Sequence, residues 1–316
     1  MSRVRVAITG ANGFIGQHLV KHFTAAGWTV NPIVRADLSP ASGPHHLEQI
    51  LAGAGVLVHA AGATRAPTPA QLHDSNVELT RRVVRAARDA KVGRFVFISS
   101  QAAAGPAASR DAPTSETAPC APIEAYGRSK RDAESVVRGA GADGLPFVIL
   151  RPSSVYGPAD RDFLSLFRLA RRRVAIHPAN REHWISIISV HDLVDAIASA
   201  ATAPAALGET LFLCNDDPVQ WSTLFALAAS SAGVDLSVDV ELPRAIVQLG
   251  ATFGDLAARL TGHAGLVTSE KVALSRPRYW ICSNARARRV LSFSPRVSLQ
   301  QGFDETYHWY REHRWL

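Results

Sequence analysis

The sequence predicts an α/β protein in which a doubly wound parallel sheet is accompanied by a smaller, mostly helical C-terminal lobe. In the first half, apolar β-like runs alternate with helix-like segments, the pattern of βαβ units in a parallel sheet. The stretch TGANGFIG at residues 9–16 has glycines three apart, between an apparent strand and an apparent helix. At 316 residues the chain can form one large domain, or a domain with a smaller lobe.

The expected elements follow in chain order. Strands are expected at residues 4–9, 29–34, 56–59, 95–99 and 147–150, with helices near 14–26, 76–91 and 125–139. Between Arg35 and Val56 there is little room for a strand plus a helix, so we expect that edge strand to be short or absent.

After residue 158 the pattern loosens. FLSLFRLARRR and HDLVDAIASAAT look helical, WISIISV looks like a strand, and ETLFLC can be a last strand of the main sheet. We therefore assign residues 1–157 and 185–215 to the sheet domain, and residues 158–184 and 216–316 to a substrate-binding lobe.

Composition and charge narrow the function classes. The formal net charge is +7, much of it arginine on predicted helices, which indicates either a solvated helix face or an anionic ligand. No basic tract with interleaved aromatics points to nucleic acid. No signal pattern or long uncharged apolar run is present, and residues 243–260 carry charges that favour an amphipathic helix. We expect a cytoplasmic protein with a small-molecule substrate and neither a nucleic-acid nor a membrane partner.

The cysteines Cys120, Cys214 and Cys282 lie far apart in the sequence and lack the spacing of a zinc site or a disulfide framework. We expect inert thiols in a reducing compartment and no metal.

The glycine loop is a candidate phosphate site. Gly10, Gly13 and Gly16 allow close backbone approach, and the helix that follows offers unpaired N–H groups to an anion. A tight turn needs glycines too, but the strand and helix on either side favour a dinucleotide.

Two further motifs suggest acid/base chemistry. In YGRSK, Tyr126 and Lys130 lie four apart in a helix-like stretch, on one helical face. A phenol titrates near pH 10, and a nearby ammonium lowers that pKa. Ser99 and Ser100 end the predicted strand 95–99, where ligands of doubly wound sheets bind. Either hydroxyl can bond a substrate oxygen, or make only local backbone bonds.

Together, the GxxGxxG loop, Ser100, Tyr126 and Lys130 resemble the extended branch of the short-chain dehydrogenase/reductase superfamily, the NAD-dependent epimerase/dehydratase family. VHAAG (58–62), NVELTRRVVRAA (76–87), LRPSSVYGP (150–158) and SVHDLVDAI (189–197) extend the resemblance over essentially the whole chain. It implies a Rossmann-type sheet and a homodimer formed through the helices after Asn76 and at 125–139.

The resemblance also implies roles for single residues. Tyr126 would be the general acid/base, Lys130 would lower its pKa and bind the nicotinamide ribose, and Ser100, counted back from Gly105, would orient the substrate oxygen. Asn76 would complete the catalytic set by helping to hold the cofactor site. The implied cofactor-binding residues are Gly10, Asn12, Gly13, Phe14, Ile15, Gly16, Arg35, Ala60, Ala61, Gly62, Asn76, Ser99, Tyr126, Lys130, Ser154 and Val155.

The end of the second strand bears on cofactor choice. An acidic residue there normally binds the adenosine ribose, whereas an arginine accommodates a 2′-phosphate. Here the acidic position falls on Val34 and Arg35 follows, so NADP is favoured; Asp37 reaching back would favour NAD instead.

The resemblance is compatible with three chemistries, namely carbonyl reduction, nucleotide-sugar epimerisation and dehydration, and with one non-catalytic role. Dehydratases of the family carry an Asp-Glu pair where this chain has Gln101 and Ala102, which argues against dehydration. Nucleotide-sugar epimerases carry an asparagine at Ser154 and a diphosphate-binding arginine near Ile185. We therefore expect an NADP-preferring reductase or dehydrogenase of a small carbonyl or hydroxyl compound. The alternatives are an NAD-dependent nucleotide-sugar 4-epimerase and a non-catalytic nucleotide-binding regulator.

Overall fold

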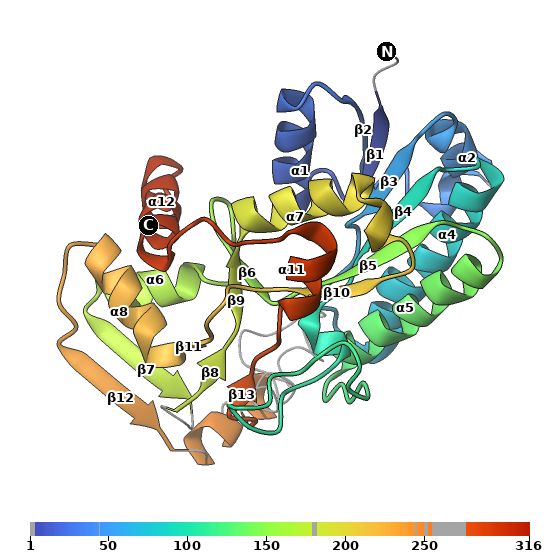
Figure 1. The fold of residues 1–316 in the computed structure, drawn as a ribbon. Coiled ribbons are helices and arrows are strands. Elements are labelled where there is room, and N and C mark those ends of the chain that lie inside the picture. Colours follow the sequence, from blue (N-terminus) through green and yellow to red (C-terminus); the bar gives the residue numbers. More distant parts are fainter. Residues whose placement is uncertain (1–3, 44, 179–181, 244, 250–251, 255–275) are drawn as a thin grey trace.

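The computed structural model describes residues 4–43, 45–178, 182–243, 245–249, 252–254 and 276–316 (Figure 1). Its centre is a parallel six-stranded sheet in the order β10-β5-β4-β3-β1-β2. This confirms the predicted α/β, Rossmann-type fold. The strands are β1 (Arg5–Thr9), β2 (Thr29–Ile33), β3 (Val56–His59), β4 (Arg94–Ile98), β5 (Phe147–Pro152) and β10 (Thr210–Leu213).

Helices cover both faces of the sheet because successive strand residues point to opposite sides. In β1, Val6 and Ile8 pack in one core and Ala7 in the other. The first core is covered by α1 (Phe14–Ala25) and α7 (Val190–Thr202), and the second by α2 (His46–Leu51), α4 (Leu79–Asp89) and α5 (Ala125–Ala142) (Figure 1).

The segment expected to lack an ordinary edge strand does lack one. Residues 34–55, apart from the undescribed residue 44, contain the short turn η1 (Pro40–Ser42) and α2 but no strand, so β2 is the outermost strand described on that side. The predicted helix 76–91 begins earlier than expected, as α3 (Pro69–His73), and passes through the π-helical segment η2 (Asp74–Glu78) into α4.

The C-terminal lobe has its own core. Tyr156, Phe167, Phe225, Phe303 and Tyr310 are among its buried aromatic side chains. The lobe contains α6 (Leu164–Arg171), β7 (Val174–Pro178), β8 (Trp184–Ile185), β11 (Val219–Gln220), α8 (Trp221–Ser231), β12 (Val238–Leu242), β13 (Tyr279–Trp280) and α12 (Leu299–Glu312).

WISIISV, expected to be one strand, is two. β8 pairs with β11 and β13, whereas β9 (Ile187–Ser189) pairs with β6 (Ser154–Tyr156). Ser186 separates them because its N–H bonds Trp280 O and its hydroxyl accepts the N–H of Cys282, each a bond to the segment of β13.

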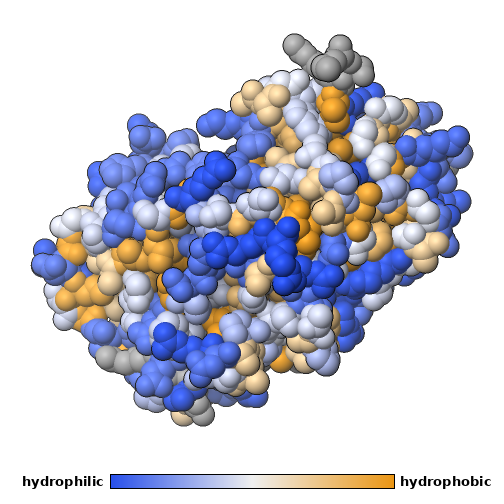
Figure 2. Space-filling model, in the orientation of Figure 1, coloured by the Kyte–Doolittle hydropathy of each residue, from blue (hydrophilic) through white to orange (hydrophobic). Residues whose placement is uncertain are grey.

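The polypeptide returns to the sheet near its end. Ala287 and Leu291 of α11 (Ala285–Leu291) pack in the core shared with α1 and α7. Hydrophilic side chains gather over α11, whose sequence is ARARRVL (Figure 2). The predicted domain boundaries, which place these residues in the lobe, stay a prediction.

The three cysteines are far apart in sequence but close in space. Cys214 and Cys282 are buried together, with a hydrogen bond from the Cys214 thiol to Cys282 O, and Cys120 packs against the same cluster. All three thiols are free. In the described part of the chain, no helix is both long and apolar enough to cross a membrane.

Candidate active site

The sequence-predicted residues converge on the carboxyl ends of β1, β3 and β4. β1 lies between β2 and β3, so the connections after β1 and β3 leave in opposite directions along the sheet. This is the topological switch point at which doubly wound sheets bind ligands.

The glycine loop packs closely against its neighbours. Gly10 has φ +71°, and a Cβ there would lie 2.9 Å from the backbone of Ala61. A Cβ on Gly16 would lie 2.0 Å from Gly10 O. Larger residues would therefore push the loop away from both β3 and α1.

The N-terminus of α1 offers hydrogen-bond donors. Gly13 caps the helix without a side chain, no acidic residue lies in the first turn, and Asn12 beside it is exposed. Phe14 and Ile15 face the sheet core. This arrangement fits a pyrophosphate group, because the unpaired N–H groups and the positive helix end both favour an anion.

Asn76 holds the loop after β3 in place. Its Oδ1 accepts the N–H of Ala63 at 2.8 Å, and its Nδ2 donates to Ala63 O at 2.9 Å and to Ser129 Oγ at 2.8 Å. The Ser129 hydroxyl donates in turn to Tyr126 O. Asn76 thus joins the segment containing Ala60, Ala61 and Gly62 to α5, as a positioning residue.

Tyr126 and Ser100 meet at the mouth of the site. Glu124 caps α5 by accepting the N–H of Gly127 at 2.7 Å. A Cβ on Gly127 would lie 2.3 Å from Ala102 O, so only glycine lets α5 come this close to the turn after Ser100. Ser100 forms a side-chain hydrogen bond with Tyr126, as expected for a pair that shares one substrate oxygen.

Burial raises the pKa of Tyr126 to about 12, and its bond with Ser100 opposes the rise. The carboxylates of Glu124 and Asp162 contribute further to the raised pKa. Tyr126 is therefore a protonated phenol at neutral pH, ready to donate a proton.

Lys130 lies one helical turn further along α5 and is buried. Its ammonium donates to Ile98 O at 2.6 Å and lies 4.5 Å from the centre of the Phe97 ring. Burial lowers its pKa to about 8, against the opposing charge of Glu134. The ammonium therefore sits at the carboxyl end of β4, where the resemblance places the nicotinamide ribose.

The two neighbouring serines have different surroundings. The Ser99 hydroxyl donates to Glu134 Oε1, which also accepts from Arg151 Nε at 2.8 Å. Ser99 is buried and its side chain turns away from Tyr126, so only its backbone remains available to a cofactor. The choice of Ser100 over Ser99 as the substrate-binding hydroxyl agrees with this geometry.

Two predicted contacts lie at the ends of the site. Ser154 and Val155 are half-buried in β6, directly after β5. At the far end Arg35 is exposed, while Asp37 folds back so that its Oδ2 accepts the N–H of Val34 at 2.8 Å. A carboxylate and a guanidinium thus both adjoin the end of β2.

Sequence reasoning missed a buried polar chain beneath the site. The hydroxyl of Thr9 lies 2.7 Å from His59 Nδ1 and accepts the N–H of Ala61, while His59 Nε2 lies 3.0 Å from the hydroxyl of Thr80. Thr80 donates to Asn76 O, so His59 must donate to Thr80 and accept from Thr9. The apolar strand VLVH offered no signal for this role.

Two more polar features border the site. Gln101 follows Ser100 and is buried, with no hydrogen-bond partner for its Nε2. Arg65, after β3, forms an ion pair with Asp162, after β6, and so links the loops that follow these two strands.

Known proteins resemble the chain over nearly its full length. It is 29% identical to a ceramide reductase of Caulobacter vibrioides, with 98% of this chain and 96% of the relative covered. A 4-hydroxy-2-methyl-3-oxo-4-farnesyl-3,4-dihydroquinoline-1-oxide ketoreductase of Stigmatella aurantiaca is 28% identical, with 95% of each covered. A UDP-glucose 4-epimerase of Vibrio cholerae is 26% identical, with 95% of this chain and 94% of the relative covered.

The fold is also found among solved structures. MoeE5 in complex with UDP-glucose and NAD superposes with a TM-score of 0.78 at 23% identity, covering 98% of this chain and 99% of that one. The model of the NAD dependent epimerase/dehydratase family matches residues 6–212. With its parallel sheet, glycine loop and Ser-Tyr-Lys constellation, the chain is an NAD(P)-dependent enzyme of oxidoreductase or epimerase type that belongs to the NAD dependent epimerase/dehydratase family.

Proposed function

We propose that the protein is an NADP(H)-preferring reductase that converts a ketone to a secondary alcohol, with Ser100, Tyr126 and Lys130 in its active site. The observation that carries the proposal is the contact between Ser100 and a protonated Tyr126 beside the buried Lys130. The two reductases among the relatives support it, since they match this chain over nearly its full length.

The residues fit a dinucleotide. The α1 N-terminus and the Gly10–Gly16 contact suit its pyrophosphate, and Tyr126 and Lys130 suit the nicotinamide ribose. When bound, the reduced cofactor supplies the hydride for the carbonyl carbon. The Ser100 hydroxyl would hold the carbonyl oxygen, and Tyr126 would donate its proton to that oxygen to give the alcohol. Lys130, as a nearby cation, stabilises the phenolate left on Tyr126 until solvent protonates it again.

We further propose that the ketone belongs to a molecule with a large apolar part, rather than a small compound as the sequence suggested. The names of the two reductases specify a ceramide and a farnesylated ring.

The preference for NADP rests on Arg35, which is exposed at the end of β2. Its planar guanidinium suits a 2′-phosphate, whereas the Asp37 carboxylate is already bonded to Val34. Arg35→Ala should weaken NADP binding about tenfold or more, the range of a charge-assisted contact, and leave NAD binding nearly unchanged. Equal losses for both cofactors would contradict this assignment.

The epimerase is the second candidate, favoured by the relative from Vibrio cholerae. The positions characteristic of these epimerases argue against it: Ile185, where the diphosphate-binding arginine would stand, is buried, and Ser189, where a histidine is usual, instead caps α7 by accepting the N–H of His191. Arg278 is paired with Glu182, and Arg181 lies outside the described residues.

The first experiment is mass spectrometry of the nucleotide released when freshly purified protein is denatured. Tightly held, near-stoichiometric NAD would favour an epimerase, which keeps its cofactor through each turnover. Exchangeable NADP(H), with NADPH oxidation on long-chain ketones that is lost in Tyr126→Phe, is the result expected here. A Tyr126→Phe variant that binds cofactor and retains turnover would overturn the proposal.

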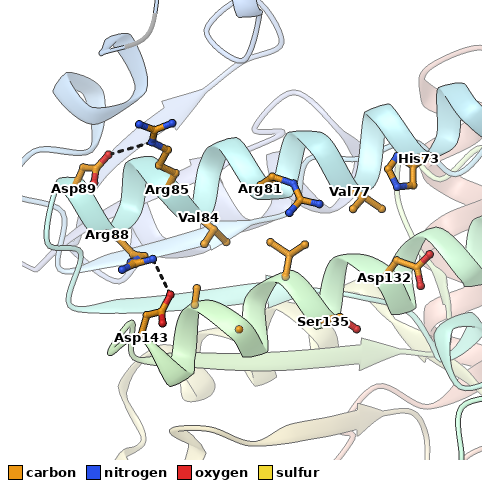
Figure 3. A pocket seen from close by; sticks show the side chains of 13 residues that line it. His73, Val77, Arg81, Val84, Arg85, Arg88, Asp89, Asp132, Ser135 and Asp143 are labelled. Atoms are coloured by element: carbon orange, nitrogen blue, oxygen red, sulfur yellow. Dashed lines mark hydrogen bonds and ion pairs between the residues drawn. The ribbon is translucent and has the colours of Figure 1, made fainter.

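We also propose a homodimer built on α4 and α5. Between these helices runs a groove lined by Val77, Val84 and Val136 and by charged residues such as Arg81 and Asp132 (Figure 3). Such an alternation of apolar and charged groups suits a self-complementary contact.

A further inference from the structure

Exposed apolar side chains are concentrated in one part of the lobe. In the described residues, eight large apolar side chains are exposed, and five of them lie between residues 238 and 253. We call these five the 238–253 patch: Val238 (45% exposed), Val240 (40%), Ile246 (57%), Leu249 (60%) and Phe253 (65%).

The strand of the patch, β12, is exposed along most of its length. Val238, Asp239, Val240 and Glu241 are all exposed, and the Asp239 carboxylate also contacts the fully buried His177 of β7, with Nε2 and Oδ1 2.9 Å apart. β12 therefore presents both its valines and its carboxylates to solvent. β12 lies at the outer edge of the lobe, at the lower left of Figure 1.

The helical part of the patch is likewise largely exposed. Residues 245–249 and 252–254 are helical, and Val247 is buried next to Leu242. Ile246 and Leu249 lie three apart in the first of these segments, the spacing of one helix face, and Phe253 in the second segment is exposed as well. This face is exposed, so the segment contacts the lobe through Val247 and presents its larger apolar side chains outward.

A run of arginines borders the patch. Arg171, Arg172 and Arg173 follow one another at the end of α6 and are all exposed. The carbonyl of Arg173 accepts the N–H groups of Ser237 and Val238, at 2.9 and 3.0 Å, so the run ends where the patch begins.

We infer that the 238–253 patch is a docking surface for an anionic lipid bilayer. Exposed apolar side chains beside a cluster of arginines are the combination by which interfacial elements bind membranes: the apolar groups enter the acyl boundary and the cations meet the lipid phosphates. A two-fold contact between copies would instead bring two arginine runs to one interface. This inference departs from the expectation, drawn from the sequence, that the chain has no membrane partner.

The inference is consistent with an apolar substrate, and that link alone rests on the proposed function. A bilayer surface is where a ketone with long hydrocarbon chains is found, so docking would bring the lobe to its substrate. Binding to vesicles, in contrast, needs neither cofactor nor substrate.

The test is co-sedimentation of the full-length protein with vesicles of phosphatidylcholine, with and without phosphatidylglycerol. The wild type is expected to bind the anionic vesicles, and less tightly in high salt. Leu249→Ser with Phe253→Ser should reduce this affinity at least tenfold, the effect of withdrawing one apolar side chain or more. Arg171→Gln with Arg172→Gln should remove most of the dependence on phosphatidylglycerol.

The matched control is Val4→Ser with Leu207→Ser, which changes two apolar residues of similar exposure, 47% and 45%, outside the patch. This variant should bind as the wild type does. The inference is overturned if wild-type protein stays in solution with anionic vesicles. It is also overturned if the patch variant, Leu249→Ser with Phe253→Ser, and the control variant lose affinity for the vesicles equally. Loss of self-association in the patch variant, in place of loss of vesicle binding, would overturn it as well. NADPH turnover of a water-soluble ketone, measured alongside, reports on the proposed function separately.

Discussion

His59 makes the stability of the folded protein depend on pH in the acid range. Its ring is fully buried, and the hydroxyls of Thr9 and Thr80 hold it in one neutral tautomer. Burial, helped by the nearby charge of Lys130, lowers the pKa of His59 to about 3. Because the unfolded chain takes up a proton near pH 6.5 and the folded chain does not, stability is lost as pH falls below that value.

We expect His59 to account for about 2 kcal/mol of the stability lost between roughly pH 7.5 and pH 5. Urea unfolding at a series of pH values measures this, with His59→Asn as the variant that cannot titrate. The variant should start less stable but show a flatter pH dependence. Parallel pH curves for the two proteins would contradict the assignment.

Ser99 and Ser100 make a matched pair for testing the site. Ser100→Ala removes a hydroxyl that contacts Tyr126, and kcat should fall by about 10²-fold, as for other donors to a reacting oxygen. Ser99→Ala removes one bond to the buried Glu134, so stability should fall by about 1 kcal/mol while kcat stays nearly unchanged. Steady-state kinetics and urea unfolding of both variants separate the roles, and a larger kcat loss in Ser99→Ala would reverse them.

Residue types and spacing were enough to predict this pair only in part. Counting back from Gly105 identified Ser100, because the turn after β4 has a fixed length in the family it resembles. The Glu134–Arg151 pair that holds Ser99 joins positions 17 apart, in α5 and β5, and no local pattern announces such a contact. The His59 chain was missed for the same reason, since it joins three separate segments.

At the scale of elements, α5 contains, besides Gly127, two glycines with opposite surroundings. A Cβ on Gly139 would meet nothing within 4 Å, whereas one on Gly141 would lie 2.1 Å from the Phe147 ring. Gly139→Ala should therefore stabilise the protein by up to about 1 kcal/mol through helix propensity. Gly141→Ala should destabilise it, because the ring at the start of β5 must move.

Thermal or urea unfolding of the two alanine variants checks this prediction. Since neither glycine contacts Tyr126 or Lys130, cofactor affinity should remain that of the wild type in both. Destabilisation of equal size in the two variants would contradict the prediction. It would show that the open space at Gly139 and the Phe147 contact at Gly141 do not decide the sign of the change in stability.

Strands and helices with a regular apolar pattern could be predicted from the sequence, but the points at which the chain breaks such a pattern into two elements could not. The five strands expected in the first half all form within two residues of their predicted ends, because each is a short apolar run between turn residues. β8 and β9 were read as one strand because WISIISV is rich in β-branched and aromatic residues and contains no Gly or Pro. The break at Ser186 depends on a partner almost a hundred residues later.

For the whole molecule, the α4/α5 groove predicts the oligomeric state. Light scattering coupled to size exclusion should give a dimer mass, and Val136→Glu, which places a carboxylate in the groove, should shift it to the monomer. Leu207→Glu, at an exposed position outside the groove, is the control and should remain dimeric. A wild type that elutes as a monomer at all concentrations would overturn the expected assembly.

The absence of a strand beyond β2 has a consequence for the protein in a crowded solution. It leaves the backbone of β2 open on one side, and an open parallel edge can recruit a strand from another chain and start aggregation. Pro32, within β2, has no N–H to offer such a partner. At the opposite edge, the Glu116 carboxylate occupies the N–H of Phe212 in β10. Each margin of the sheet thus has one backbone position that cannot donate to an added strand, Pro32 because it is an imino acid and Phe212 because a side chain already accepts its N–H.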